Sequence, residues 1–599
     1  MDPRDTLRHG DPKSIHLIGG NNVFNKSQAQ CAQASMQQTR NLTSSNLEDF
    51  ELNCTHLRDT ERSEFISLSP HRLLWPIPIE KELKNTAELL VECLKTEGVR
   101  YIFGQFGEDR SLIGRALRKS SIQFIPTRHS RGAASMAYAY SRLTGQPGVC
   151  LARSMQNILN FLPGIADANL NHAPLVVITE QVITDSIPID TRENLNLTNL
   201  FAPATQWSYQ IDYPTSTPEI VRKAFLQAEA GTNRGLPRAV HLNLPETIAV
   251  ISSSKSPLEQ GMRGNANPAP KMLAQAAKRI SWVHTPLILV GSGAIQAQVR
   301  DTLIEFATQL EVPVVNTVMA KGIIPETHPL SLGTIASPQN HRHYGIDWAD
   351  LVITVGCNAT ECAPQYWNPD GDIPIIHIDN SSAEVNRHYQ PNLELVGNLS
   401  NLLASLLQQV DRQGKLDTYP LELRALNRAA IRQYANDTYI PFKPKALVHA
   451  LQAVLNPEDI LLSDTGVHRE WIIRDYSCEF PNKCLTFHES SPTGLVLSGA
   501  IAAKLVHPQH KVLAVTGADG FMGSYLELES AQWLKTPFVS LICNQGGYYP
   551  DFVEIAKSMG FKGYRVTASD DLIPILEIAL NQEIPIIIDC PMDYSENIC

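Results

Sequence analysis

Two glycine-containing stretches near the C-terminal end of the chain, 515–521 (VTGADGF) and 543–549 (CNQGGYY), each continue an apolar run. The runs, 511–515 and 538–542, have the length and composition of buried strands. Loops at the carboxyl ends of neighbouring parallel strands form the crevice in which a doubly wound sheet binds its ligand. The sequence therefore predicts an α/β sheet with a ligand site at this edge. The alternative is a pair of strand-to-helix turns without a ligand.

The residues that follow the first run predict how an anion is held there. Gly517 and Gly520 allow a tight turn, and a helix is predicted over 525–534. The first N–H groups of a helix favour negative charge. The pattern is typical of a phosphate and metal site.

The same alternation of strands and helices starts much earlier, at residue 86. Helices are predicted over 86–97, 111–120, 131–143 and 158–170, and strands over 101–103, 123–125, 148–151 and 175–178. Strands that alternate with helices of this length indicate a parallel sheet. The polar, proline-bearing segment 252–271 is typical of a linker and closes this first domain.

A second α/β domain follows the linker. Its predicted strands are 287–290, 314–316, 351–355 and 375–378. The stretch 291–294 (GSGA) lacks the third glycine of a dinucleotide fingerprint, so it predicts an ordinary helix start and no flavin is expected. A charged helical connection, 411–445, then leads to a third domain that begins with a strand at 460–462.

The predicted fold class is therefore α/β, with three doubly wound parallel-sheet domains behind a flexible N-terminal extension. The expected boundaries are 1–82 for the extension and 83–255, 268–412 and 440–599 for the three domains. Residues 1–82 are rich in Gln, Asn, Ser and Thr without a sustained period, which favours flexibility. The apolar segment 73–79 (LLWPIPI) leaves a docking arm open as the alternative.

Composition excludes several classes of partner. The formal net charge is −11 and no basic stripe is interleaved with aromatics, so nucleic acid is not expected. No apolar run approaches the ~20 residues of a membrane span, and the N-terminus lacks a signal-peptide core. The 11 cysteines have no C-x-x-C spacing, which predicts reduced, mostly buried thiols and a cytoplasmic protein.

The C-terminal stretches, together with 499–507 (GAIAAKLVH), resemble the diphosphate domain of thiamine-diphosphate enzymes, catabolic acetolactate synthases in particular. The stretches 104–108, 127–134 and 164–170 resemble the pyrimidine domain of that family, and 366–372 resembles its central domain. The resemblance spans residues 86–597. It implies an enzyme that joins a decarboxylated 2-oxo acid to a second oxo acid, with thiamine diphosphate and Mg²⁺ as cofactors, in a homodimer or homotetramer.

The metal-binding positions of the family are not retained. The family's Gly-Asp-Gly aligns with residues 517–519, so Ala518 replaces a metal-binding aspartate, and Gln545 replaces the second Asn or Asp of the following motif. Asp519, after a one-residue slip of the turn, and Gln545, through its carbonyl oxygen, are the candidate metal ligands. By the same resemblance, the candidate cofactor-binding residues are Gly517, Gly520, Asn544, Gly546, Gly547, Thr493, Asp464 and His468.

The catalytic positions also differ. The resemblance places Ser130 where the family carries the glutamate that activates thiamine, and loss of a proton-transfer partner costs about 10² to 10⁴ in rate. Thr493 replaces the methionine that bends the cofactor, 155–157 (MQN) replaces a Gly-Pro-Gly turn, and the lid expected after 548–549 is absent from the sequence. Polar residues gather at these positions, and the candidate catalytic residues are Ser130, His129, Arg131, Arg153, His488 and Glu489.

These departures predict that acetolactate synthesis is weak or lost and that the pocket is rebuilt for a small anionic ligand or a 2-oxo acid. Three hypotheses stay open. The chain is a carboligase with a degenerate site, an enzyme that uses the old pocket without thiamine, or a noncatalytic partner of an active relative. The charged residues around the pocket also have an ordinary interpretation, in which they pair with each other or face solvent.

Overall fold

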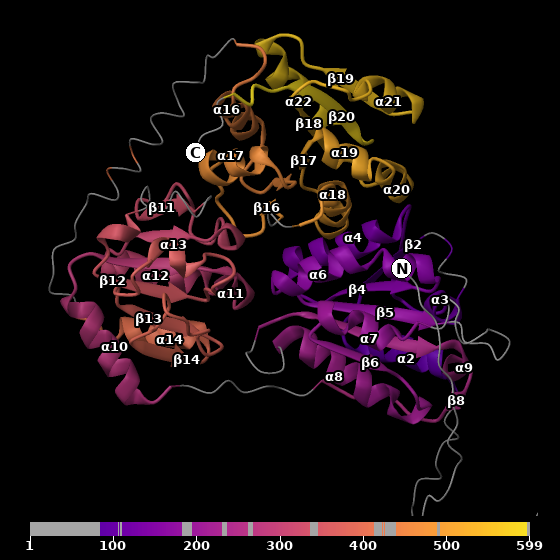
Figure 1. Ribbon diagram of the computed structural model, residues 1–599, viewed down its shortest axis with the longest axis horizontal. Helices are drawn as coiled ribbons and strands as arrows, with labels where there is room; N and C mark the ends of the chain where they lie inside the picture. The colour runs from indigo at the N-terminus through magenta and orange to yellow at the C-terminus, as the bar shows by residue number, and fades with distance from the viewer. Residues whose placement is uncertain are drawn as a thin grey trace, which may run out of the picture. The chain divides into compact units, whose positions relative to one another are not determined.

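The computed structural model describes residues 84–595, apart from 106, 108–110, 182–194, 231–235, 261–267, 336–344, 412–421, 423–424, 426–438 and 488–490. The described chain forms three six-stranded sheets, and all strand pairs within them are parallel. Helices flank each sheet (Figure 1). The predicted class of three parallel-sheet α/β domains is confirmed. The N-terminal extension lies outside the described residues.

The strands of the three sheets follow one another along the chain. The first sheet has the order β3-β2-β4-β5-β7-β6 and the second β11-β10-β9-β12-β13-β14, and the third is β16-β15-β17-β18-β20-β19. Their bounds are β2 Tyr101–Gln105, β3 Gln123–Thr127, β4 Gly148–Ala152, β5 Leu175–Gln181, β6 Trp207–Gln210, β7 Ala239–Pro245, β9 Pro286–Val290, β10 Val314–Asn316, β11 Ser331–Thr334, β12 Leu351–Val355, β13 Ile375–Asp379, β14 Leu393–Val396, β15 Ile460–Ser463, β16 Cys484–Thr486, β17 Val512–Gly517, β18 Val539–Asn544, β19 Lys562–Arg565 and β20 Ile586–Pro591. A short antiparallel pair, β1 (Lys84–Asn85) and β8 (Ser252–Ser253), lies outside the three sheets.

Each sheet has an internal point at which the strand order reverses, and such a switch point marks where a ligand crevice opens; the first and third sheets reverse again at their β7-β6 and β20-β19 edges. The internal reversals lie between β2 and β4, between β9 and β12, and between β15 and β17. In the third sheet, β15 ends just before Asp464 and β17 ends at Gly517. Both predicted phosphate-site loops therefore start from strands at or beside the third switch point.

Helices connect the strands and cover the sheets. In the first domain they are α2 Thr86–Thr96, α3 Leu112–Leu117, α4 Ser130–Thr144, α5 Met155–Leu159, α6 Leu162–Leu170, α7 Leu197–Phe201, α8 Thr217–Ala230 and α9 Glu246–Ala249. In the second they are α10 Pro270–Trp282, α11 Ser292–Gln296, α12 Arg300–Leu310, α13 Pro364–Trp367 and α14 Leu399–Leu407. In the third they are α16 Pro444–Val454, α17 Val467–Asp475, α18 Leu495–Val506, α19 Ala518–Ser524, α20 Glu527–Leu534, α21 Phe552–Ser558 and α22 Leu572–Leu580. No helix within these described ranges is long and apolar enough to cross a membrane.

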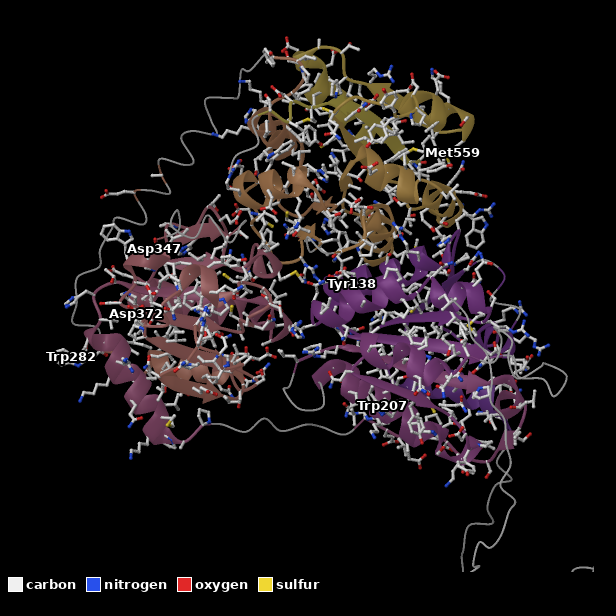
Figure 2. The ribbon with its side chains drawn as sticks, viewed as in Figure 1. Tyr138, Trp207, Trp282, Asp347, Asp372 and Met559 are labelled. Carbon is white, nitrogen blue, oxygen red and sulfur yellow. The ribbon has the colours of Figure 1, made fainter. Side chains whose placement is uncertain are left out.

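One hydrophobic core joins the first and third domains through α4 and α18. Small residues on both helices permit close packing, since a Cβ atom at Gly499 of α18 would lie 3.6 Å from the Cβ of Ala139 on α4. Tyr138 of α4, labelled in Figure 2, packs its ring 5.8 Å from that of Phe487, which follows β16. Burial of aromatic side chains contributes strongly to such a contact. The start of α4 is therefore held against the third domain.

Several predicted element boundaries are wrong. The helix predicted over 158–170 is two helices, α5 and α6, and Pro163 stands in the first turn of α6, where its missing N–H is tolerated. The helix predicted over 525–534 begins two residues later, as α20, and a separate helix, α19, forms before it where a turn was predicted. The linker predicted to end at 271 ends earlier, because α10 begins at Pro270. Helix α11 begins at Ser292, as predicted for 291–294, whereas most of 411–445 lies outside the described residues.

Candidate functional site

The side chain of Asp464 ties together three segments at the third switch point. Its Oδ2 accepts hydrogen bonds from Gly494 N at 2.7 Å and from the Thr516 hydroxyl at 3.0 Å, and its Oδ1 accepts one from Thr465 N at 3.0 Å. A Cβ atom at position 520 would lie 2.3 Å from Asp464 Oδ2, a separation that real Cβ atoms do not show. Glycine is therefore required at 520 by the approach of a buried carboxylate and not by a tight turn, because Gly520 lies inside α19.

His468 lies beside the same loops, on α17. The residue is 2% exposed, and its Nε2 has no partner among the described residues. Burial lowers the pKa of His468 to about 4, so the imidazole is neutral near pH 7. A Cβ atom at Gly517 would lie 3.6 Å from the Cε1 of this ring. Asp464, His468, Gly517 and Gly520 are called the cradle below, and all four were predicted as cofactor-binding residues.

The burial of Asp464 predicts a pH dependence of stability. Burial raises the pKa of Asp464 from 3.8 to about 6, although its hydrogen-bond donors and the charge of Arg131 act in the opposite direction. Because the folded-state pKa is the higher one, the folded protein binds this proton more tightly than the unfolded chain. The stability that results is present below about pH 4 and is lost as the pH rises through about 6.

We expect Asp464→Asn, which cannot ionise, to lack this part of the pH dependence. Urea unfolding of both proteins between pH 4 and 7 measures the effect. As the pH rises from 4 to 7, the wild-type protein should lose more free energy of unfolding than the variant does. Hydrogen bonds lost in the variant would change the stability difference at every pH but not this trend. A difference that stays constant over the range would show that Asp464 does not ionise with a raised pKa.

The start of α4 is fixed by a carboxylate from α20. Glu527 accepts hydrogen bonds from Arg128 N at 3.2 Å and His129 N at 3.0 Å, and burial raises its pKa. A Cβ atom at Gly132 would lie 2.3 Å from Glu527 Oε1. This contact was not predicted, because no local motif marks the partner of a residue some 400 positions away. The position of Ser130 thus depends on Glu527.

Three predicted catalytic residues lie in or next to the first turn of α4. Ser130 is fully buried, and its hydroxyl has no partner among the described residues. His129 is the N-cap, since its Nδ1 accepts a hydrogen bond from Arg131 N at 3.1 Å. Burial lowers the pKa of His129, with a further contribution from Arg131. The catalytic roles of these residues stay predictions. The role that the geometry gives His129 is to cap the N-terminus of α4.

Arg131 brings a positive charge to the cradle. Its guanidinium donates to the carbonyl oxygen of Thr493, and it makes no ion pair with a described carboxylate. Gly494 has a φ of 85°, and a Cβ atom there would lie 2.7 Å from Gly520 O and 3.0 Å from Arg131 Nη2. Gly520 therefore lies next to Gly494, Thr493 and Arg131. Arg131 and Thr493 were assigned to the same site from the sequence, and the two residues are in contact.

Another predicted catalytic residue, Arg153, has a carboxylate partner of its own. Arg153, which follows β4, pairs with Glu246 at 3.3 Å, with both side chains partly exposed. Its charge is therefore neutralised locally and does not act as a free cation. His488 and Glu489 lie outside the described residues.

Both candidate metal ligands, Asp519 and Gln545, contact the hydroxyl of Tyr549. Asp519 accepts a hydrogen bond from the Tyr549 hydroxyl at 2.9 Å, and the Gln545 side chain contacts the same hydroxyl. The interaction with Asp519 raises the pKa of Tyr549. Ala518, at the aligned metal position, is buried and supplies no ligand. No group of three or more His, Cys, Asp or Glu among the described residues has metal-binding geometry.

The second glycine loop forms a turn that hydrogen bonds of Asn544 hold. Asn544 donates from Nδ2 to Asp589 at 2.8 Å and accepts at Oδ1 from Gly546 N at 2.9 Å. Gly546 and Gly547 have φ values of 77° and 115°, which favour glycine. The loops thus fit a diphosphate at the cradle, where His468 offers an unpartnered nitrogen. The residues at 518, 519 and 545 do not fit the Mg²⁺ that accompanies a diphosphate. Mg²⁺ prefers carboxylate and phosphate oxygens that are free to coordinate, whereas Ala518 has none and Asp519 and Gln545 contact the Tyr549 hydroxyl.

Family comparisons cover most of the described chain. The family described as "Thiamine pyrophosphate enzyme, N-terminal TPP binding domain" matches residues 84–201. The central domain of the same enzymes matches 273–406, and the C-terminal TPP binding domain matches 464–549 and 545–590. Each match falls on one of the three parallel sheets, in the order expected from the sequence.

Curated relatives are similar over nearly their whole length. A probable acetolactate synthase large subunit of Methanocaldococcus jannaschii is 29% identical over 551 residues, 85% of this chain and 92% of that protein. An acetolactate synthase of Bacillus subtilis is 29% identical over 544 residues, 86% and 94% of the two chains. A catabolic acetolactate synthase of Raoultella terrigena is 28% identical over 546 residues, 86% and 97%.

Proposed function

The chain belongs to the thiamine pyrophosphate enzyme family, with similarity to acetolactate synthases over 86% of its length, and we propose that its cofactor site is rebuilt to hold a small anionic ligand in place of magnesium-bound thiamine diphosphate. One observation carries the proposal. The carboxylate of Asp519 accepts a hydrogen bond from the Tyr549 hydroxyl, and alanine occupies the buried position 518. A diphosphate would therefore lack its cation, and an uncompensated buried charge costs about 3–5 kcal/mol.

The groups left at the site favour a compact anion. Arg131 supplies a guanidinium without a carboxylate partner in the described chain, and such groups bind carboxylates through strong charge-assisted hydrogen bonds. The buried Ser130 hydroxyl and His468 Nε2 have no partner in that part of the chain and add neutral polar groups. The family's chemistry on 2-oxo acids makes a 2-oxo carboxylate the ligand class proposed here. Its carboxylate is placed against Arg131.

The serine at position 130 is an argument that thiamine-dependent catalysis is weak or absent. A serine hydroxyl can donate a hydrogen bond but cannot supply the carboxylate that the family uses at this position, a loss of about 10² to 10⁴ in rate. A thiamine-independent enzyme and a noncatalytic partner of an active relative both remain compatible with an anion at Arg131. Assembly as a homodimer or homotetramer and a cytoplasmic location stay predictions.

Calorimetric titration of the full-length protein with pyruvate tests the proposal. We expect saturable binding that Arg131→Gln weakens by about tenfold or more, because the charge-assisted hydrogen bonds are lost. Arg115→Gln, on an exposed face of α3, is the matched control and should leave affinity unchanged. Absence of pyruvate binding to the wild-type protein, or equal binding by Arg131→Gln, would overturn the assignment.

A further inference from the structure

A cavity of about 420 Å³ lies where parts of all three domains meet. Its walls come from residues 141–146 at the end of α4, 171–174 after α6, and Ser292, Ile295, Gln296 and Gln298 in and after α11, completed by Met319 and Asn482. The cavity shares no lining residue with the cradle. Arg131 and Arg142 lie 11 positions apart on α4, or about 16 Å along a helix axis. The cavity is therefore a separate place from the cofactor site.

Direct hydrogen bonds between domains hold the walls in place. Gln296 Nε2 in the central domain donates to His172 O in the first domain at 3.2 Å. Arg142 Nη1 at the end of α4 donates to Thr486 O in the third domain at 3.2 Å. Cavities with such preformed walls bind ligands without a large ordering cost.

One positive charge dominates the lining. Arg142 is the only residue with a formal charge among the described residues that line the cavity. Its two hydrogen bonds to described residues, to Thr486 O and at 3.4 Å to the Tyr138 hydroxyl, use the same nitrogen, Nη1. It makes no ion pair in the described part of the chain. The guanidinium therefore keeps donors for a carboxylate.

Two buried carboxylates feel the charge of Arg142 and have hydrogen-bond partners of their own. Glu361 accepts hydrogen bonds from the Thr317 hydroxyl at 2.7 Å and from Asn358 Nδ2 at 2.8 Å, and from Ser292 as well. Asp167 accepts hydrogen bonds from Ser491 and Asn171 at Oδ1, whereas its Oδ2 has no partner among the described residues. Burial raises the pKa of both groups and the charge of Arg142 acts to lower it, but Arg142 makes no hydrogen bond or ion pair with either carboxylate in the described chain.

The rest of the lining is divided between neutral polar and apolar groups. The amides of Gln146, Gln298 and Asn482 offer both donors and acceptors, and His172, 3% exposed, has an Nδ1 without a partner among the described residues. Leu143 and Ile295 supply an apolar surface. A ligand that matches this set carries one carboxylate, one or more hydroxyl groups and a short branched alkyl group.

We propose that this cavity is a second ligand site, which binds a small hydroxy-monocarboxylate with its carboxylate on Arg142 and its alkyl group against Leu143 and Ile295. Because the lining comes from three domains, a bound ligand contacts all of them at once. The site does not depend on what the cradle binds.

Titration of the full-length protein with 2-hydroxy-3-methylbutanoate tests the second site. We expect saturable binding that Arg142→Gln weakens by about tenfold or more, since the charge-assisted bonds to the carboxylate are lost. Ile295→Trp, which fills the cavity without changing its charge, should weaken binding to a similar degree. Arg131→Gln and Arg115→Gln should both leave affinity unchanged.

Each outcome supports or overturns the second site. Loss of binding in Arg131→Gln with retention in Arg142→Gln would assign the ligand to the cradle and overturn the second site. Absence of binding to the wild-type protein would also overturn it. If Arg142→Gln does not fold, Ile295→Trp still tests the location, because retained affinity in a filled cavity contradicts the proposed site. Loss of pyruvate binding in Arg131→Gln is measured separately, so the two proposals can fail independently.

Discussion

Replacement of Lys321 by methionine is expected to lower the free energy of unfolding by about 3–5 kcal/mol, the cost of leaving a buried charge unpaired. Lys321 Nζ donates to both carboxylate oxygens of Glu326, at 2.9 and 2.8 Å, and to Ile473 O at 2.9 Å. The two side chains are 1% and 5% exposed. Glu326 also accepts from Cys478 N at 2.9 Å, so the pair joins the second domain to the third. Methionine keeps the length of lysine and removes its charge.

Urea unfolding followed by circular dichroism measures this loss. Lys119→Met is the matched control, because Lys119 forms an ion pair with Glu88 but is 74% exposed, and exposed pairs contribute only about 0–1 kcal/mol. The double variant Lys321→Met with Glu326→Leu should recover part of the stability, since no unpaired charge remains. A single variant that unfolds at the same urea concentration as Lys119→Met would contradict the importance given to the buried pair.

Restoring the family's metal ligands by Ala518→Asp with Gln545→Asn is expected to raise thiamine diphosphate affinity by about two to four decades in the presence of Mg²⁺. Position 518 is buried next to the cradle, so an aspartate there adds the carboxylate that the metal position lacks. Turnover should not return with affinity, because Ser130 remains in place of a carboxylate. Calorimetric titration with and without Mg²⁺ measures the gain.

Ala518→Asn with Gln545→Asn is the matched control for that experiment. It has nearly the same shape and no carboxylate, so it should show little Mg²⁺-dependent gain. An equal gain in both double variants, or a gain that does not require Mg²⁺, would show that the missing cation ligand is not what limits cofactor binding.

The strands were predictable where their side chains are continuously apolar. Residues 351–355 match β12 and 314–316 match β10 at both ends. Strand β5 extends three residues beyond the predicted 175–178, because its polar end is buried and satisfied by distant partners. Thr179, for example, hydrogen-bonds His241 at 2.9 Å and Asn243 at 2.9 Å. A local pattern cannot reveal such partners on another strand.

Motifs in the sequence were enough to select the residues of the cradle as candidates. The contacts that require these residue types could not be predicted. Gly520 is needed because Asp464 approaches it, and not for a turn. Glu527 holds the start of α4 without any sequence signal. The pairing of Arg153 with Glu246 and the contact of Asp519 with Tyr549 also join residues that are distant in the chain. Sequence therefore identified candidates, whereas only the structure shows which charges are already neutralised.

Acetolactate formation from pyruvate by the unmodified full-length protein, with excess thiamine diphosphate and Mg²⁺, tests the rebuilt site most directly. A product assay of the wild-type protein beside an active acetolactate synthase of the same family provides the comparison. With Ala518, Gln545 and Ser130 at the metal and activating positions, no detectable acetolactate is expected. Robust Mg²⁺-dependent acetolactate synthesis would contradict the account and return the chain to the ordinary chemistry of its family.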